Sequence, residues 1–130
     1  MLIPQELRYT KTHEWAKRQD GDIIVGITAH AQDELRDVVY AEPPAVGKTL
    51  KQGDAAAIVE SVKAAFDIYA PVAGTVTRVN ADLAKSPQLI NHDCYGKGWL
   101  FALKPSDPKE WDTLLTGDAY QQLIQSTAHS

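Results

Sequence analysis

A single lysine between two short runs of strand-forming residues constrains this chain more than any other feature. Residues 56–62 and 66–69 are rich in β-branched, aromatic and other apolar side chains, which favour β-strands. The join around Lys63 and Ala64 is too short for anything but the tip of a β-hairpin. A lysine at such a tip holds a primary amine on a long stem, far from the body of the domain. It is suited to amide linkage with a carboxylic acid, although an unmodified surface lysine is the commoner case.

Short strand signals recur through the middle of the chain, separated by Gly, Pro, Asp or Asn. Residues 23–27 and 38–40 are two such segments. Residues 47–50, before the lysine hairpin, resemble residues 74–77 after it, because each segment opens with a glycine and continues as a strand. The pattern predicts a mainly β chain built as a pseudo-symmetric β-sandwich.

Three helices are predicted around these strands. Residues 29–35 form a brief internal helix, and a C-terminal pair occupies about residues 107–125. The first helix of the pair begins with Asp107 as its N-cap, Pro108 in the first turn and Glu110 as a capping-box glutamate.

The apolar residues of the C-terminal pair predict two packing faces. Trp111, Leu114 and Leu115 share one face of the first helix, and Gly117 ends that helix. In the second helix three apolar residues recur at positions i, i+3 and i+4, namely Tyr120, Leu123 and Ile124. The polar tail after Gln125 is expected to fray.

Length, charge and cysteine content narrow the class of protein. The 130 residues fit one domain, which can bury a core without metal or disulfide support. The one cysteine, Cys94, excludes an intramolecular disulfide and suits a reducing compartment. A net charge of −4 gives no basic stripe for nucleic acid and no polybasic segment for a membrane, so the expected partners are proteins. Residues 1–4 are too few for a signal peptide, and no run approaches the roughly 20 apolar residues of a transmembrane helix. A cytoplasmic location is expected.

The residues around Lys63 form a longer pattern. Glu60–Ala64 follows Gly53-Asp54 and precedes the stretch Asp67–Val76, which contains an Ala-Pro-Val-Ala-Gly turn. This pattern resembles the lipoyl-attachment region of the glycine cleavage system H-protein family. Further segments resemble signatures of that family in the same order: 9–15, 25–28, Asn91, 95–100 and 104–108. The resemblance spans about residues 7–124. Biotin carriers usually flank their lysine with methionine, and the chain's one methionine is Met1, which argues against biotin.

The resemblance implies a fold and a function. The fold is a lipoyl-domain-like β-sandwich, a barrel-sandwich hybrid, with one carrier domain over residues 1–130. Lipoate on Lys63 would carry an aminomethyl group from the PLP-dependent glycine decarboxylase to the aminomethyltransferase. Dihydrolipoamide dehydrogenase would reoxidise the arm, and a lipoylating enzyme would attach it. The chain itself would be a carrier and not an enzyme. This agrees with the absence of GxSxG, glycine-rich phosphate-loop and CxxC motifs.

The resemblance also assigns roles to polar residues near the lysine. Glu14 and Asp67, with the Thr12 hydroxyl, are expected to line a cleft that holds the amine of the loaded arm by charge-assisted contacts. The alternative is that both acids are ordinary surface charges. Glu60 and Ser61 are expected to be recognised by the lipoylating enzyme.

Neither the histidines nor the tryptophans suggest another site. The four histidines are scattered, without carboxylate or cysteine at ligand spacing, so no metal site is expected; they are His13, His30, His92 and His129. No catalytic residue is expected either. The tryptophans are also dispersed and predict packing positions in the core or a cleft wall: Trp15, Trp99 and Trp111.

Four positions depart from the family pattern. Phe66 stands where a small residue is usual, and Arg36 replaces a common glycine. Pro43 and Cys94 replace a usual leucine and proline. Phe66 and Arg36 are expected near the hairpin face that partners contact. Two alternative functions therefore stay open, a lipoyl donor that supplies 2-oxoacid dehydrogenases and an interaction module whose lysine is never modified.

Overall fold

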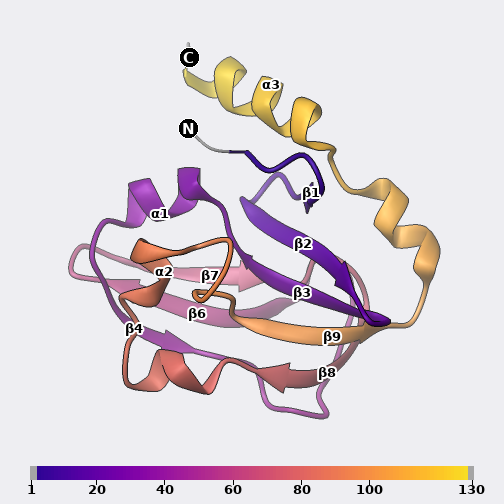
Figure 1. Cartoon of the computed structure of the whole chain (residues 1–130), viewed down its shortest axis with the longest axis horizontal. Helices are drawn as coiled ribbons and strands as arrows, with labels where there is room; N and C mark the ends of the chain where they lie inside the picture. Colours follow the sequence, from indigo (N-terminus) through magenta and orange to yellow (C-terminus); the bar gives the residue numbers. More distant parts are fainter. Residues whose placement is uncertain (1–2, 129–130) are drawn as a thin grey trace.

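The computed structural model describes residues 3–128, so Met1, Leu2, His129 and Ser130 lie outside it. Within that range the strands form two antiparallel sheets (Figure 1). The larger sheet has the order β1 (Arg8–Tyr9), β2 (Glu14–Gln19), β3 (Asp22–Ile27), β9 (Phe101–Pro105), β8 (Gly74–Val79) and β5 (Thr49–Leu50). The smaller sheet has the order β4 (Val38–Glu42), β6 (Ala55–Ser61) and β7 (Ala65–Tyr69). The prediction of a mainly β chain is confirmed.

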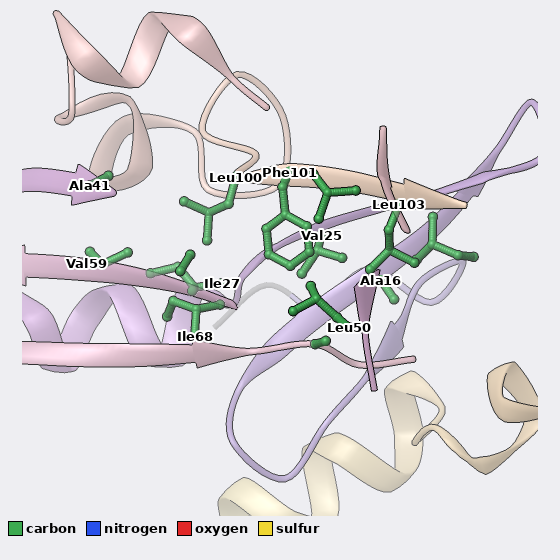
Figure 2. Close-up of a cluster of buried hydrophobic side chains, with 14 of the residues drawn as sticks. Ala16, Val25, Ile27, Ala41, Leu50, Val59, Ile68, Leu100, Phe101 and Leu103 are labelled. Carbon is green, nitrogen blue, oxygen red and sulfur yellow. The ribbon is translucent and has the colours of Figure 1, made fainter. Parts of the chain in front are cut away.

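The core lies between the two sheets because each strand turns its alternate apolar side chains inward. Figure 2 shows Val59 and Ile68 of the smaller sheet in one cluster with Val25, Ile27 and Phe101 of the larger sheet. All five are at most 4% exposed. Together they hold the lysine hairpin, β6–β7, against the rest of the molecule.

The two similar segments that flank the hairpin in the sequence are paired with each other. Thr49 of β5 lies opposite Thr75 of β8, and Leu50 lies opposite Gly74. A Cβ atom on Gly74 would come within 2.3 Å of the Lys104 carbonyl oxygen on β9. The glycine at that position is therefore required by the close approach of two strands.

The internal helix is where the sequence predicts it, at α1 (Ala29–Leu35). Thr28 is its N-cap, and the Thr28 hydroxyl accepts a hydrogen bond from Ala31 N. Leu35 is buried in the core. Arg36 follows as the C-cap with φ 67° and ψ −142°, a backbone conformation that favours glycine.

The C-terminal pair differs from the prediction at its first helix. This helix is a 3₁₀ segment, η2 (Pro108–Thr113), with Asp107 as N-cap and Pro108 in the first turn. Leu114 is its C-cap and Leu115 pairs with Tyr9 in a β-bridge, so the predicted shared helical face is wrong. The capping box is also wrong, because the Glu110 carboxylate accepts a hydrogen bond from Ala73 N at 2.7 Å.

Gly117 does not end a helix but begins one, α3 (Gly117–Ala128). The hydroxyl of Thr116 accepts from Ala119 N at 3.2 Å, so a hydroxyl residue supplies the N-terminal cap just before the glycine. The helix continues past Gln125, where a fraying tail was expected. The predicted packing face is confirmed, since Tyr120 is fully buried and Leu123 and Ile124 pack beside it.

Helix α3 packs against the outer side of the larger sheet, near β1 (Figure 1). The rings of Tyr120 and Tyr9 are stacked with their centroids 4.7 Å apart, beside Trp15. Two short helices that the sequence did not predict complete the fold: η1 (Ala81–Ala84) and α2 (Leu89–His92).

Candidate functional site

Lys63 lies in a three-residue turn, Val62–Ala64, that joins β6 to β7. Ser61 shapes this turn. Its backbone N donates to the Ala64 carbonyl oxygen at 2.8 Å, and its hydroxyl oxygen accepts from Lys63 N and Ala64 N at 3.2 and 3.1 Å. Two of the three backbone donors of the turn are therefore satisfied by one hydroxyl group, as in other turns built on serine. Ser61 is buried and fixes the backbone beneath the lysine.

The side chain of Lys63 is exposed. Within residues 3–128, no hydrogen bond or ion pair involves its amine. The preceding residue, Val62, is 72% exposed, so the whole tip projects into solvent. A long side chain without a partner keeps its rotamers free and its terminal atom accessible to another protein.

Glu14 begins β2 and has no solvent-exposed surface. Its Oε1 accepts hydrogen bonds from the hydroxyls of Thr10 and Thr12. Its Oε2 accepts from the backbone N of Tyr69, the last residue of β7, at 3.2 Å. The carboxyl group therefore connects the start of β2 in the larger sheet to β7, an edge strand of the smaller sheet. Burial raises the pKa of Glu14, and the hydrogen bonds from Thr10, Thr12 and Tyr69 oppose that rise.

Glu14 and Asp67 line different hollows. Glu14 borders a hollow of about 280 Å³ between β1, β7 and the segment that follows η2. Asp67 is exposed and borders a hollow of about 100 Å³ between β7 and α1, beside the lysine hairpin. Thr12 lines both. Glu14, Asp67 and Thr12 were expected to share one cleft. In the structure Thr12 lines both hollows, whereas each of the two acids lines a different one.

The smaller hollow is mostly apolar, with Ile27, Leu35 and Ile68 in its wall. Phe66, which is 44% exposed, also lines it. The hollow thus lies between the hairpin that carries Lys63 and helix α1. Phe66 contributes an aromatic ring to the wall of this hollow.

A hydrogen-bonded group that the sequence did not predict borders the same hollow. His13 Nδ1 lies 2.8 Å from the Tyr120 hydroxyl, which lies 2.7 Å from the Thr28 hydroxyl that caps α1. Burial lowers the pKa of His13, and the neighbouring His30, whose ring centroid is 4.5 Å away, lowers it further. These residues come from three distant segments, so no local sequence signal could have grouped them. The group fixes the start of α1 against α3.

The described residues contain no group of three or more His, Cys, Asp or Glu side chains that could hold a metal ion. Of the four histidines considered as possible metal ligands, His129 lies outside the described part of the chain. Among the helices described, none is long and apolar enough to cross a membrane.

Burial raises the pKa of the Cys94 thiol to about 11, so this thiol is protonated at neutral pH.

Comparison with known proteins identifies the family. The profile described as "Glycine cleavage H-protein" matches residues 7–127. The chain belongs to the glycine cleavage H-protein family. It is 53% identical over 128 residues to a glycine cleavage system H protein of Thermus thermophilus, a match that covers 98% of this chain and 100% of that protein. It is 52% identical over 130 residues to the protein of the same name from Thiobacillus denitrificans, covering 99% of this chain and 100% of the relative.

A solved structure in this H-protein family has the same fold. The crystal structure of a glycine cleavage system H protein from Mycobacterium marinum matches this chain with a TM-score of 0.88 and 35% sequence identity. The match covers 95% of this chain and 99% of that one. The expected family fold is therefore confirmed along almost the whole chain.

Proposed function

We propose that this H-protein family member is the lipoyl-carrying shuttle of a glycine cleavage system, with lipoate attached to Lys63 through an amide bond. The observation that carries the proposal is the exposed amine of Lys63, without a partner among the described residues, at the tip of the β6–β7 hairpin. The family match covers the hairpin and both sheets that support it.

The residues around Lys63 fit a covalently attached arm. The Ser61 hydroxyl and the Asp37 carbonyl oxygen accept from the three backbone N–H groups of the turn, so the lysine side chain is not needed to hold the hairpin together. For attachment, the Lys63 amine would attack the acyl carbon of an activated lipoyl group such as an acyl adenylate. The ammonium group would give up one proton to water before the attack and a second one afterwards, so the amide nitrogen keeps one hydrogen. The new C–N bond would replace the C–O bond to the phosphate, and AMP would leave.

When attached, lipoate supplies a reducible disulfide, one sulfur of which can carry the aminomethyl unit from glycine decarboxylase to the aminomethyltransferase. The chain's own residues would hold and shield the carried unit, while the partner enzymes, with dihydrolipoamide dehydrogenase, would supply the catalytic groups. The hollow of about 100 Å³ beside the hairpin offers apolar walls for shielding.

Thr12, Asp67, Glu34 and His13 are the polar residues that line this hollow, and we propose that Thr12 and Asp67 face a positively charged amine there. Glu14 would act indirectly. Its carboxyl group already accepts three hydrogen bonds, one of them from Thr12, so it fixes the Thr12 side chain that lines the hollow.

Replacing Lys63 tests the attachment. We expect Lys63→Arg to abolish lipoyl incorporation and glycine-dependent activity while the fold is retained, because arginine keeps the charge but does not form this amide. The measurement is the intact mass of the protein after incubation with lipoate, ATP and a lipoate ligase, followed by a glycine decarboxylation assay.

Lys51→Arg is the matched control, because Lys51 is also an exposed lysine in a turn beside β6. This variant should take up one lipoyl group, as the parent chain does. A lipoyl adduct that persists in Lys63→Arg would refute the assignment of the attachment site.

A further inference from the structure

Strand β4, which flanks the lysine hairpin, exposes two adjacent apolar residues. Val39 is 51% and Tyr40 is 47% exposed. Val38 and Ala41 on either side of them are buried in the core. Regular strand geometry alternates between the two faces of a sheet and would place one of two adjacent residues inside.

A β-bulge causes this exposure. Val38 pairs with Ser61 and Tyr40 pairs with Glu60, so Val39 is an extra residue in the strand. In a strand without the bulge, Tyr40 would share the inward face of Val38. The insertion instead turns Tyr40 to the outer face, and Ala41 takes the inward position opposite the buried Val59.

The exposed residues are continuous with the lysine turn. Tyr40, Glu60 and Ala65 are paired in one row across β4, β6 and β7, and side chains of directly paired residues lie on the same face. At the tip, Val62 N donates to the Asp37 carbonyl oxygen at 3.2 Å, one residue before β4 begins. Val39 and Tyr40 on β4, together with Val62 in the lysine turn, therefore form an apolar surface next to Lys63.

Protection of a sheet edge explains the bulge in β4 but not the apolar residues that the bulge exposes. β4 is an edge strand, and edge strands avoid unwanted pairing through bulges and charged side chains. Valine and tyrosine are strand-forming residues, and their exposure has the opposite effect. Tyrosine is enriched at the centres of protein interfaces because it supplies a large contact area at low entropic cost.

We propose that the outer face of β4–β6–β7, centred on Tyr40 with Val39 and Val62, is the docking surface for the enzyme that attaches the lipoyl group to Lys63. This inference rests on the proposed function. An enzyme that acylates Lys63 must enclose the tip of the hairpin, because the amine lies only one side-chain length from the backbone. The apolar surface on β4 adjoins that tip, because the Asp37 carbonyl oxygen just before β4 accepts from Val62 N. It would give the enzyme a second strand to bind in addition to the hairpin.

The test compares two variants in a lipoylation assay with a purified lipoate–protein ligase, lipoate and ATP, followed by intact mass. The double variant Val39→Ser/Tyr40→Ser should lower kcat/KM for lipoylation about tenfold or more, as loss of an interface hot spot does. The control Val46→Ser removes an apolar side chain that is 61% exposed in the loop after β4, away from the hairpin tip. It should stay within about twofold of the parent rate.

Two further measurements separate docking from other effects. Acetylation of Lys63 by a small N-hydroxysuccinimide ester should be equal in the parent chain and the double variant, because no docking is needed. The double variant should also show the parent chain's circular dichroism spectrum.

Several outcomes would overturn the inference. One is lipoylation of the double variant at the parent rate. This includes the case in which sedimentation shows that the substitutions convert a dimer of this chain into a monomer but leave lipoylation unchanged. Another is an equal loss of reactivity toward the small ester. A parent chain that takes up no lipoyl group would overturn both this inference and the proposed function, whereas the first two outcomes leave the proposed function intact.

Discussion

At the scale of single residues, this protein places a buried carboxyl group and an exposed amine at opposite extremes of solvation. Glu14 has no exposed surface and accepts hydrogen bonds from two threonine hydroxyls and one backbone N–H. Lys63 is exposed, and no ion pair holds it within residues 3–128. The first group holds two sheets together and the second is available to other proteins. The sequence shows two charged residues but not this difference, because burial depends on what packs around each side chain.

The raised pKa of Glu14 makes a prediction about stability and pH. A carboxyl group with a raised pKa in the folded state binds more protons folded than unfolded, so it stabilises the fold below its unfolded pKa. That stabilisation is lost as the pH rises from the usual glutamate value of about 4.3 through the raised value. Glu14→Gln cannot ionise, and its amide can still accept from Tyr69 N and donate to the threonine hydroxyls. The stability of this variant relative to the parent chain should therefore improve as the pH rises.

Urea unfolding at about pH 4, 6 and 8 measures the effect as the difference in free energy of unfolding between variant and parent chain. Glu42→Gln is the control, since Glu42 is an exposed glutamate at the end of β4. A difference for Glu14→Gln that is constant over this pH range would show that burial does not perturb the carboxyl group in the folded chain.

At the scale of elements, the sequence predicts a segment correctly where hydrogen bonds between residues close in the chain form its turn or its cap. In the lysine hairpin the Ser61 hydroxyl accepts from Ala64 N in the turn, and in α1 the Thr28 side chain caps the N-terminus. The C-terminal pair is different, because its decisive contacts are long-range. Glu110 accepts from Ala73 N, which is distant in the sequence, so the expected capping box does not form.

The end of α1 carries a prediction about strain. Arg36 adopts φ 67° and ψ −142°, which costs a side-chain-bearing residue about 1–3 kcal/mol. Arg36→Gly would relieve this strain but lose about 0.5–1 kcal/mol to the greater freedom of glycine in the unfolded chain. We expect a net stabilisation of about 1 kcal/mol, measured by chemical unfolding.

The control for this change is Arg36→Ala, which removes the same charge but keeps a Cβ atom and hence the strain. It should not stabilise the protein. Equal stabilisation by glycine and alanine would assign the effect to the arginine charge and exclude backbone strain.

At the scale of the whole molecule, the carrier function and the fold are separated in space. The core is formed by side chains of both sheets (Figure 2). A second cluster, which contains Tyr120, lies under α3. Lys63 belongs to neither cluster. The body can therefore be stable whether or not the lysine carries an arm.

This separation predicts that attachment of lipoate leaves stability nearly unchanged. The Tm values of the unmodified and lipoylated proteins should agree within about 3 °C, which corresponds to less than about 1 kcal/mol for a chain of this size. Differential scanning calorimetry of the two forms, separated by mass, measures this. A larger increase in Tm on lipoylation would mean that the attached arm packs on the body even without its cargo.

The sequence by itself determined the β-hairpin with Lys63 at its tip, the helix over residues 29–35 and the two-sheet character of the chain. These features follow from short-range rules, in which strand propensity, turn length and capping act over a few residues. Only the tertiary structure decided that Glu14 is buried, that Glu14 and Asp67 border different hollows, and that a bulge turns Tyr40 outward. Each of these depends on contacts between segments far apart in the chain, and local sequence patterns carry no information about which distant residues meet.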